Sequence, residues 1–545
     1  MKNIRRRTFL KNTVVAGIGT SLTGPSLAGL SLSAGWGPEN PSPRAGGSER
    51  PTKSKKIIVA GAGISGLCCA YELMKRGHEV FVLEASGRHG GHVFTGRDGL
   101  SDGLYADFGA DHITKPGYER FFEYVDEFNL AVLPYPHAEG STAAPGGHML
   151  RMIDGKFYTE EMLADPVVLG KFGFNDREIR FLATNPRHDF PSLFVKSYLG
   201  KFTDEMQPFG VGYDELDKIS LSDLYKKEGA SPAALRILGG QGESALYSLW
   251  RLAVMGFRGI PLSEGDTYRL KGGNQELPTA FARKLGDRVK LNHPILSIRR
   301  SDTGVSVTYK AFGYAEEKEM SADVLVNCIP LPVFRKIPVT PALSAGKQYV
   351  VDNLGYSSHP FYVFEASSKF WLEDGFKSIN MEFEHPDISS IWQASEPVVK
   401  TGGEGERNDA PTKVMGGSPG EGAGKGGNGA AGQSAPDVES SRIILKAYGP
   451  GGVSAQRGLA AFREVYPGKH DTIVQALTVD WTKDKYSPTC EMLAFPVGEM
   501  HKFWPELIKP DGRIYFAGTY ADTLSRGMES CLRSAQRVAK EIDPL

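Results

Sequence analysis

Residues 55–66 read KKIIVAGAGISG, an apolar run followed by glycines in the spacing Gly-x-Gly-x-x-Gly. A short apolar run of this kind is typical of a buried parallel strand, and the glycines open a predicted helix that ends near Arg76. A second predicted strand, 79–83, ends at Glu84. The order of strand, glycine turn, helix, strand and acid predicts a dinucleotide-binding unit at the start of an α/β fold.

Each part of this unit has a mechanical role. Gly61 makes the tight turn, Gly63 lets backbone amides approach a pyrophosphate, and Gly66 lets the helix pack closely on the strand. The phosphates are then expected at the helix N-terminus, with Glu84 accepting from ribose hydroxyls. The turn residues expected at the cofactor are Gly61, Gly63, Ile64, Ser65 and Gly66.

Composition excludes several classes of protein. The 545 residues include 63 basic and 64 acidic side chains, which give a formal net charge of −1. Without a positive field, binding to nucleic acid or to an anionic membrane is not expected. The five cysteines show neither Cys-x-x-Cys spacing nor pairing with histidines at zinc-ligand spacing, so neither a metal site nor a disulfide framework is expected.

The N-terminal segment 1–34 is predicted to be an export signal. It reads RRRTFLK from Arg5 to Lys11 and continues as a mildly apolar, uncharged stretch. This order resembles the twin-arginine signal peptide. Glycines and a proline interrupt the stretch, so stable membrane insertion is not expected, and the mature protein is predicted to be periplasmic or secreted. Residues 35–54 are interpreted as a flexible leader.

The residues after Glu84 indicate which dinucleotide is bound. Residues 85–92 read ASGRHGGH. They resemble the FAD fingerprint of the flavin amine oxidase superfamily, which includes monoamine, polyamine and L-amino-acid oxidases and related desaturases. In that family the acid is followed by Ala and then Arg-x-Gly-Gly-Arg, which neutralises the pyrophosphate. The resemblance implies FAD, with contacts from Ala85, Arg88, Gly90, Gly91 and His92; His92 replaces the second arginine.

Later segments match the family in chain order, so the resemblance covers nearly everything from residue 55 onward. The turn at Asp107-Phe-Gly109-Ala110, the Gly272-Gly273 turn and the strand and glycine turn at 512–519 all follow the pattern. The final helix is then expected to aim its N-terminus at the flavin, where negative charge accumulates on reduction. Further contacts implied by the match are Val289 beside the adenine, and Gly518, Asp522 and Met528 near the flavin.

The resulting fold class is α/β, a Rossmann-type FAD-binding domain (GR2-like) interleaved with an α+β substrate-binding domain. A segment rich in Gly, Ser, Glu, Lys and Pro, 401–440, is predicted to be a disordered insertion because it has almost nothing to bury. The FAD-binding domain is predicted from segments 55–140, 261–340 and 481–545, and the substrate domain from 141–260 and 341–480.

The predicted active site departs from the amine oxidases. Counting from family segments puts His359 where a lysine reaches flavin N5, Glu491 where the first cage aromatic stands, and Gly527 where the second stands. We therefore take His359 and Glu491 as the catalytic candidates; the alternative is that His359 is an ordinary strand-edge residue. Cys490 matches the cysteine that bonds covalently to the flavin in monoamine oxidases, although non-covalent FAD is expected because a buried cysteine is a common structural residue.

The amino-acid oxidase branch binds the substrate carboxylate through an arginine soon after the acid-x-Gly turn. Residues 111–113 read Asp-His-Ile, so no arginine is available there. Arg251 or Arg258, from the predicted substrate domain, remains as an alternative.

The leading hypothesis is an exported, FAD-dependent, amine oxidase-like oxidoreductase that removes a hydride from a carbon next to nitrogen. The electrons would pass to O2 or a periplasmic acceptor. The substrate would be a small molecule, and an amine is the first candidate. Two alternatives stay open: a desaturase or dehydrogenase that acts on C–C or C–OH bonds, and a flavin-binding protein without turnover. A homodimer is left open.

Overall fold

The computed structural model describes residues 53–135, 150–260, 266–395 and 442–544, apart from 102, 312, 314–315, 359, 377–378, 467 and 469–471. The predicted signal peptide, almost all of the leader, the predicted insertion and His359 therefore lie outside the described residues. No helix within the described ranges is long and apolar enough to cross a membrane.

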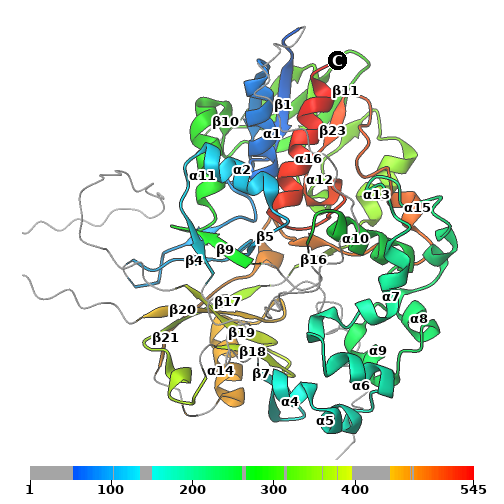
Figure 1. The fold of residues 1–545 in the computed structure, drawn as a ribbon. Helices are drawn as coiled ribbons and strands as arrows, with labels where there is room; N and C mark the ends of the chain where they lie inside the picture. The colour runs from blue at the N-terminus through cyan, green and yellow to red at the C-terminus, as the bar shows by residue number, and fades with distance from the viewer. Residues whose placement is uncertain are drawn as a thin grey trace, which may run out of the picture.

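A five-stranded parallel sheet carries the dinucleotide-binding unit (Figure 1). Its central strand is fully buried from Ile57 to Ala60, because helices pack on one face of the sheet and apolar side chains of a four-stranded sheet pack on the other. The strands, in sheet order, are β10 (Val289–Lys290), β2 (Glu79–Leu83), β1 (Lys56–Ala60), β14 (Val324–Asn327) and β23 (Ile514–Phe516). The predicted Rossmann-type α/β fold is confirmed.

Helix α1 (Ile64–Lys75) follows the glycine turn and packs against α16 (Gly527–Ile542), the last helix of the chain. The two lie side by side against the sheet in Figure 1, although more than four hundred residues separate them. Helices α11 (Glu276–Leu285) and α2 (Glu119–Glu127) complete this layer by contacting α1 and α16 respectively. The start of α16 is thereby brought close to the glycine turn.

Smaller sheets and short helices surround the parallel sheet. One four-stranded sheet has the order β13 (Glu317–Ala322), β12 (Val305–Lys310), β11 (Ile295–Arg300) and β15 (Val339–Thr340). A three-stranded sheet has the order β5 (Ile113–Lys115), β9 (Asp266–Leu270) and β6 (Val132–Pro134), and two-stranded pairs join β3 (Thr95–Gly96) to β4 (Ala106–Asp107) and β16 (Tyr356–Ser357) to β22 (Glu491–Met492). The short helices are α12 (Leu331–Phe334), α13 (Ala345–Asn353) and α15 (Met500–Phe503).

A seven-stranded, mostly antiparallel sheet lies below the parallel sheet in the view of Figure 1. Helix α14 (Ala455–Val465) packs on β17 and β21, and their apolar side chains form a separate core. The strands, in sheet order, are β21 (Ile473–Val479), β17 (Phe361–Ala366), β20 (Ile443–Tyr448), β19 (Ser390–Ser395), β18 (Asn380–Phe383), β7 (Leu150–Ile153) and β8 (Lys156–Thr159).

A group of helices between β8 and β9 forms the remaining layer. Several begin at a side chain that accepts a backbone amide hydrogen, such as Ser220, Ser231 and Ser244. The helices are α4 (Glu160–Ala164), α5 (Pro166–Lys171), α6 (Asp176–Leu182), α7 (Ser192–Leu199), α8 (Leu221–Lys227), α9 (Pro232–Leu238) and α10 (Ala245–Phe257). The sheets alternate along the chain in the order that the predicted interleaving requires, while the exact domain boundaries stay a prediction.

Candidate active site and cofactor cavity

A cavity of about 720 Å³ joins the glycine turn after β1 to the start of α16. Most of the residues that sequence analysis assigned to the cofactor or to catalysis lie on its wall. They are Gly61, Gly63, Ile64, Ser65, Glu84, Ala85, Gly90, Gly91, His92, Glu491, Gly518 and Met528, together with Cys490 and Gly527. The cavity brings the two ends of the chain's described region to one site.

The glycine turn is shaped by close backbone approaches. A Cβ atom on Gly66 would lie 2.0 Å from the carbonyl oxygen of Gly61, so helix and strand could not pack this closely with a side chain there. Gly61 has a φ of +102°, which favours glycine. A Cβ on Gly63, by contrast, would meet no described atom nearer than 3.9 Å. Gly63 therefore faces open space, as a pyrophosphate cradle requires.

The helix that begins at this turn has free donors at its first residues. Gly63 is the N-cap of α1 and has no side chain to cap it. Ile64 and Ser65 follow on the cavity wall. The N-terminus of α1 therefore presents amide groups and a partial positive charge to whatever occupies the cavity.

Glu84 lies on the wall at the end of β2 and is 9% exposed. Its Oε2 accepts from the amide of Ala62 at 2.7 Å, and its Oε1 accepts from the amide of Ser86 at 2.7 Å. These two bonds fix the carboxylate between the glycine turn and the fingerprint that follows. A carboxylate has further lone pairs, so the predicted ribose contact is compatible with both bonds.

Arg88 and His92 stack on one tryptophan. The Arg88 guanidinium lies 5.5 Å from the ring centroid of Trp481 and 4.8 Å from that of Phe94, and the His92 ring lies 4.2 Å from Trp481. Burial, helped by the charge of Arg88, lowers the pKa of His92 to about 4. His92 is therefore neutral near pH 7 and can offer a hydrogen bond, while Arg88 lies behind the wall.

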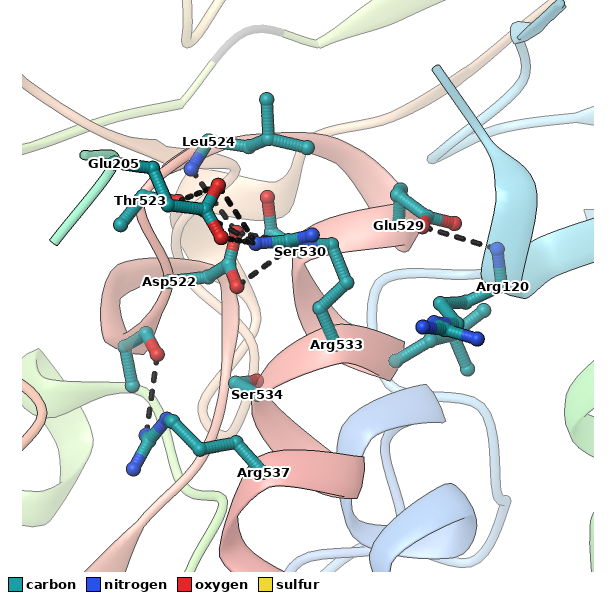
Figure 2. Close-up of polar contacts among 12 residues, drawn as sticks. Arg120, Glu205, Asp522, Thr523, Leu524, Glu529, Ser530, Arg533, Ser534 and Arg537 are labelled. Atoms are coloured by element: carbon teal, nitrogen blue, oxygen red, sulfur yellow. Dashed lines mark hydrogen bonds and ion pairs between the residues drawn. The ribbon is translucent and has the colours of Figure 1, made fainter. Parts of the chain in front are cut away.

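Four predicted cofactor residues are not on the cavity wall: Arg88, as described above, and Val289, Asp522 and Gly66. Val289 lies in β10 opposite Val82 and is not on the wall. Asp522 is not on the wall either, because Arg533 Nε donates to both of its carboxylate oxygens at 3.0 Å (Figure 2). The structure pairs the Asp522 carboxylate with Arg533, and the expected position of Asp522 near the flavin stays a prediction. Gly66 is not on the wall either, and its role is to let α1 pack closely on the preceding strand.

Glu529, which sequence analysis did not single out, is on the wall next to Met528. Its carboxylate accepts from the amides of Arg120 and Phe121 at 3.0 Å, at the start of α2 (Figure 2). Burial raises the pKa of Glu529 to about 7, against the effect of these two bonds. The only signal in the sequence is its position directly after Met528.

The cavity wall also carries Glu491, the catalytic candidate that the structure describes. Glu491 begins β22, which pairs with β16 through Ser357. Cys490 lies beside it, and burial followed by the Glu491 charge raises the pKa of the Cys490 thiol well above its ordinary value. The thiol is therefore protonated near neutral pH, and both catalytic and covalent roles at these positions stay predictions.

An aromatic ring occupies the space beside Gly527. Gly527 has a φ of +70°, and a Cβ there would lie 2.4 Å from Oη of Tyr118, which is also on the cavity wall. Position 527 therefore carries no aromatic side chain, and the hydroxyl end of a tyrosine from just before α2 lies beside it. Sequence analysis missed Tyr118 because it is far from Gly527 along the chain.

Neither arginine proposed as a carboxylate partner is on the wall. Arg258 is paired with Glu205, and Arg251 is not among the lining residues. Arg526 does line the cavity, and its guanidinium makes no hydrogen bond or ion pair with any residue that the structure describes. Sequence analysis passed over Arg526, although it stands directly before Gly527.

Asp111 and His112 lie on the wall near Phe361 and Tyr448. His112 Nδ1 is 2.5 Å from Asp111 Oδ1, and Lys446 Nζ is 2.6 Å from Asp111 Oδ2. Asp111 is 6% and Lys446 1% exposed. No local signal in the sequence marks this cluster, because Lys446 is distant from Asp111 along the chain.

Other site types find no support in the described part of the chain. No group of three or more His, Cys, Asp or Glu side chains there is placed to hold a metal ion. The five cysteines are free thiols.

Comparisons with known proteins agree with this geometry. The family model described as flavin containing amine oxidoreductase matches residues 64–543. The L-amino acid oxidase Lm29 of Lachesis muta is 28% identical over 334 residues, which cover 59% of this chain and 60% of that protein. The match therefore spans less than two thirds of that relative. The L-amino acid oxidase Bs29 of Bothriechis schlegelii is 25% identical over 532 residues, which cover 91% of this chain and 92% of that protein.

Solved structures show the same fold. Wild-type putrescine oxidase bound to putrescine matches with a TM-score of 0.66 and 18% identity, covering 90% of this chain and 99% of that one. Cyclohexylamine oxidase from Brevibacterium oxydans IH-35A matches with a TM-score of 0.65 and 18% identity, again over 90% of this chain and 99% of that one.

Proposed function

Because the chain belongs to the flavin-containing amine oxidoreductase family, we propose that it oxidises a carbon bonded to nitrogen in a small amine or α-amino acid, with O2 as the electron acceptor. FAD-dependent oxidoreductase chemistry is the family's property. The observation that carries the proposal is the single cavity that joins the glycine turn to a wall with Glu491 and Arg526.

The residues present fit FAD. Gly63 leaves a space that a side chain would fill, and α1 begins there without a side-chain cap. Arg88 Nη1, a donor, and His92 Nε2 are buried and have no hydrogen-bond partner among the described residues. When bound, the flavin supplies the two-electron acceptor for the hydride. The chain's own residues bind the substrate, exclude water and handle the proton.

The charges on the wall favour an α-amino acid over a simple amine. Arg526 offers a guanidinium without a described partner, which suits a carboxylate, and Glu491 offers a carboxylate to a substrate ammonium. Several relatives are L-amino acid oxidases, which supports this substrate class.

Anaerobic mixing tests the proposal. The purified holoenzyme is mixed with L-amino acids, their D-enantiomers, the decarboxylated amines and the matching alcohols, while flavin absorbance is followed. We expect bleaching by L-amino acids first, followed by hydrogen peroxide when O2 is admitted. Bleaching by alcohols alone would favour the dehydrogenase alternative, and bleaching by none of the panel would overturn the proposal.

Export is the second part of the proposal, and it is supported by the arginine pair Arg6-Arg7 in the predicted signal peptide. Changing Arg6 and Arg7 together to lysine keeps the charge but removes the pair that a twin-arginine pathway reads. We expect the precursor to accumulate in the cytoplasm; unchanged export of the variant would contradict the assignment.

A further inference from the structure

A loop, 522–527, runs along the cavity wall directly before α16. Leu524, Arg526 and Gly527 line the cavity. Two residues of the loop have left-handed backbone conformations, Ser525 with a φ of +61° and Gly527 with a φ of +70°. For a serine this conformation is unfavourable, because its Cβ is crowded there, and it persists where surrounding contacts hold it. The shape of the loop is therefore imposed by its partners.

Polar groups inside the loop fix this turn. Asp522 Oδ1 accepts from the amide of Leu524 at 3.0 Å, and Ser525 Oγ donates to the backbone oxygen of Asp522 at 3.1 Å. Asp522 is 8% and Ser525 6% exposed, and neither lines the cavity. Their side chains shape the loop, which leaves Leu524 and Arg526 as the side chains that it presents to the cavity.

Helix α16 holds the backbone of this part of the wall through two buried serines, one turn apart. Ser530 Oγ accepts from the amide of Arg526 at 3.1 Å and donates to the backbone oxygen of the same residue at 2.5 Å. Ser534 Oγ accepts from the amide of Gly518 at 3.0 Å. Both serines are fully buried. The backbone positions of Arg526 and Gly518 are therefore set by the helix.

Arg533 joins the loop to the layer of helices between β8 and β9 (Figure 2). Its Nε donates to both carboxylate oxygens of Asp522 at 3.0 Å, and its Nη2 donates to Glu205 Oε1 at 3.3 Å. Glu205 is itself held, because its carboxylate pairs with Arg258 and its backbone oxygen accepts from Trp250 Nε1 at 3.0 Å. The loop is therefore connected to α10 as well as to α16.

The guanidinium of Arg526 differs from those of the arginines on α16. Arg533 is bonded as described above, and Arg537 donates to the backbone oxygens of Phe516 and Ala521 at 3.2 Å. Arg526 is half-buried on the cavity wall, and its guanidinium makes no hydrogen bond or ion pair with any residue in the described ranges. A guanidinium with free donors on a fixed backbone can form two parallel hydrogen bonds to a carboxylate.

One buried tyrosine is close to both the loop and Glu491. Burial raises the pKa of the Tyr247 phenol, which also interacts with the Ser525 hydroxyl and with the charge of Glu491. Glu491 lines the cavity, as Arg526 does. The same region of the wall therefore offers a carboxylate and a guanidinium, which suits the two charged groups of an α-amino acid.

We propose, on the basis of the function proposed above, that Arg526 is the specificity-determining residue that binds the α-carboxylate of the substrate, with Ser530 and Arg533 as its positioning residues. The guanidinium donates two N–H bonds to the carboxylate, and Glu491 faces the ammonium. A decarboxylated amine with the same carbon chain makes the second contact but not the first. The site therefore selects the amino acid when substrate binds, before any hydride is transferred.

Four variants separate binding from positioning. Arg526→Met removes the donors, and Arg526→Lys keeps the charge but not the planar fork. Ser530→Ala removes both bonds to the Arg526 backbone, and Arg533→Lys cannot span Asp522 and Glu205 with the same geometry. The matched control is Arg537→Lys, one turn further along α16, because Arg537 bonds to backbone oxygens that are not on the wall.

The first measurement compares L-leucine with 3-methylbutylamine, its decarboxylated amine, in anaerobic flavin reduction by holoenzymes of equal FAD content. The readout is the ratio of the two apparent Kd values, which a general loss of structure would not change. We expect Arg526→Met to lower the preference for the amino acid about 10²-fold, the effect of losing hydrogen bonds to a charged group, and Arg526→Lys to lower it less.

The positioning residues should affect the same ratio. We expect Ser530→Ala and Arg533→Lys each to lower the preference about tenfold, because a misplaced binding group loses part of its contact, while Arg537→Lys keeps it. An unchanged ratio in Arg526→Met would overturn the proposal. Loss of FAD from Arg526→Met would also overturn it, because the guanidinium would then serve the cofactor.

The second measurement does not depend on turnover. The unreactive carboxylate 4-methylpentanoate is titrated into oxidised holoenzyme, with 4-methylpentanamide as the uncharged comparison, and binding is followed by calorimetry. We expect the carboxylate to bind more tightly than the amide to wild type, and about 10²-fold more weakly to Arg526→Met than to wild type. Equal carboxylate binding by both proteins would refute the inference, even if amino acids bleach the flavin as expected. Carboxylate binding that depends on Arg526, in a protein whose flavin no amine or amino acid bleaches, would support the carboxylate site and refute the proposed function alone.

Discussion

Lys446→Met tests how strongly the structure depends on the buried ion pair. Methionine is similar in length and fills the space beside Phe361, so the change removes a charge rather than volume. The lysine is 1% exposed, and Asp111 would keep its negative charge with only His112 and Tyr135 as partners. Breaking a buried pair costs about 3–5 kcal/mol, and because two partners remain we expect about 3 kcal/mol.

The assay is thermal unfolding of the holoenzyme, in which we expect a fall in midpoint of about 5 °C. The loss should depend on pH with a definite sign. Lys446 and His112 depress the pKa of Asp111 in wild type, so their stabilisation is present above the unfolded pKa and fades only as pH falls toward the lower folded value. The wild-type advantage over Lys446→Met should therefore shrink in acid, where the variant's carboxyl becomes protonated.

A surface pair provides the matched control. Lys483 lies 3.2 Å from Asp480 but is 75% exposed, so Lys483→Met should change stability by less than about 1 kcal/mol. If Lys446→Met behaves like Lys483→Met at pH 7, the buried pair does not stabilise the fold and the reasoning is wrong.

Three further changes probe the cavity. Gly63→Val should abolish FAD binding, because its side chain would enter the open space at the turn, and a purified variant with wild-type flavin content would refute the cradle. Gly527→Ala should lower the unfolding midpoint, and less so in a Tyr118→Phe background that lacks the Oη atom 2.4 Å from the new Cβ; equal losses in both backgrounds would mean that φ alone matters. Glu491→Gln should raise KM for amino acids about tenfold with little effect on the limiting rate of flavin reduction, and a 10²-fold fall in that rate would make Glu491 the base.

The fold could be predicted from the sequence because its decisive signals are local. The turn from Gly61 to Gly66 and the acid at Glu84 act on neighbours that are close along the chain, and the structure shows why Gly66 cannot carry a side chain. Tyr118 and Lys446 carry no such local signal. Each contributes to the site only because an element distant in sequence packs beside its partner, Gly527 in one case and Asp111 in the other.

Asp522 differs from Tyr118 and Lys446, because a local sequence pattern marks it but does not reveal its partner in the folded chain. Its place after a glycine turn resembled that of a cofactor acid, and burial raises its pKa against the effect of Arg533. The competing partner, Arg533, lies on α16, and it also contacts Glu205 from a loop before α8, so a network of ion pairs holds the carboxylate away from the wall (Figure 2). The sequence pattern places an acid near the glycine turn, but it cannot show which cation lies beside that acid in the folded chain.

The substrate end of the cavity combines one aromatic ring with charges of both signs. The Tyr118 hydroxyl lies beside Gly527, while Glu491 and Arg526 place a carboxylate and a guanidinium on the same wall. A substrate with only an ammonium would leave the Arg526 charge desolvated and without a partner, which is unfavourable in a closed cavity. A zwitterion satisfies both charges at once. The absence of the amine oxidases' aromatic pair, which the sequence predicted, is therefore consistent with the proposed amino acid substrate, which carries two opposite charges.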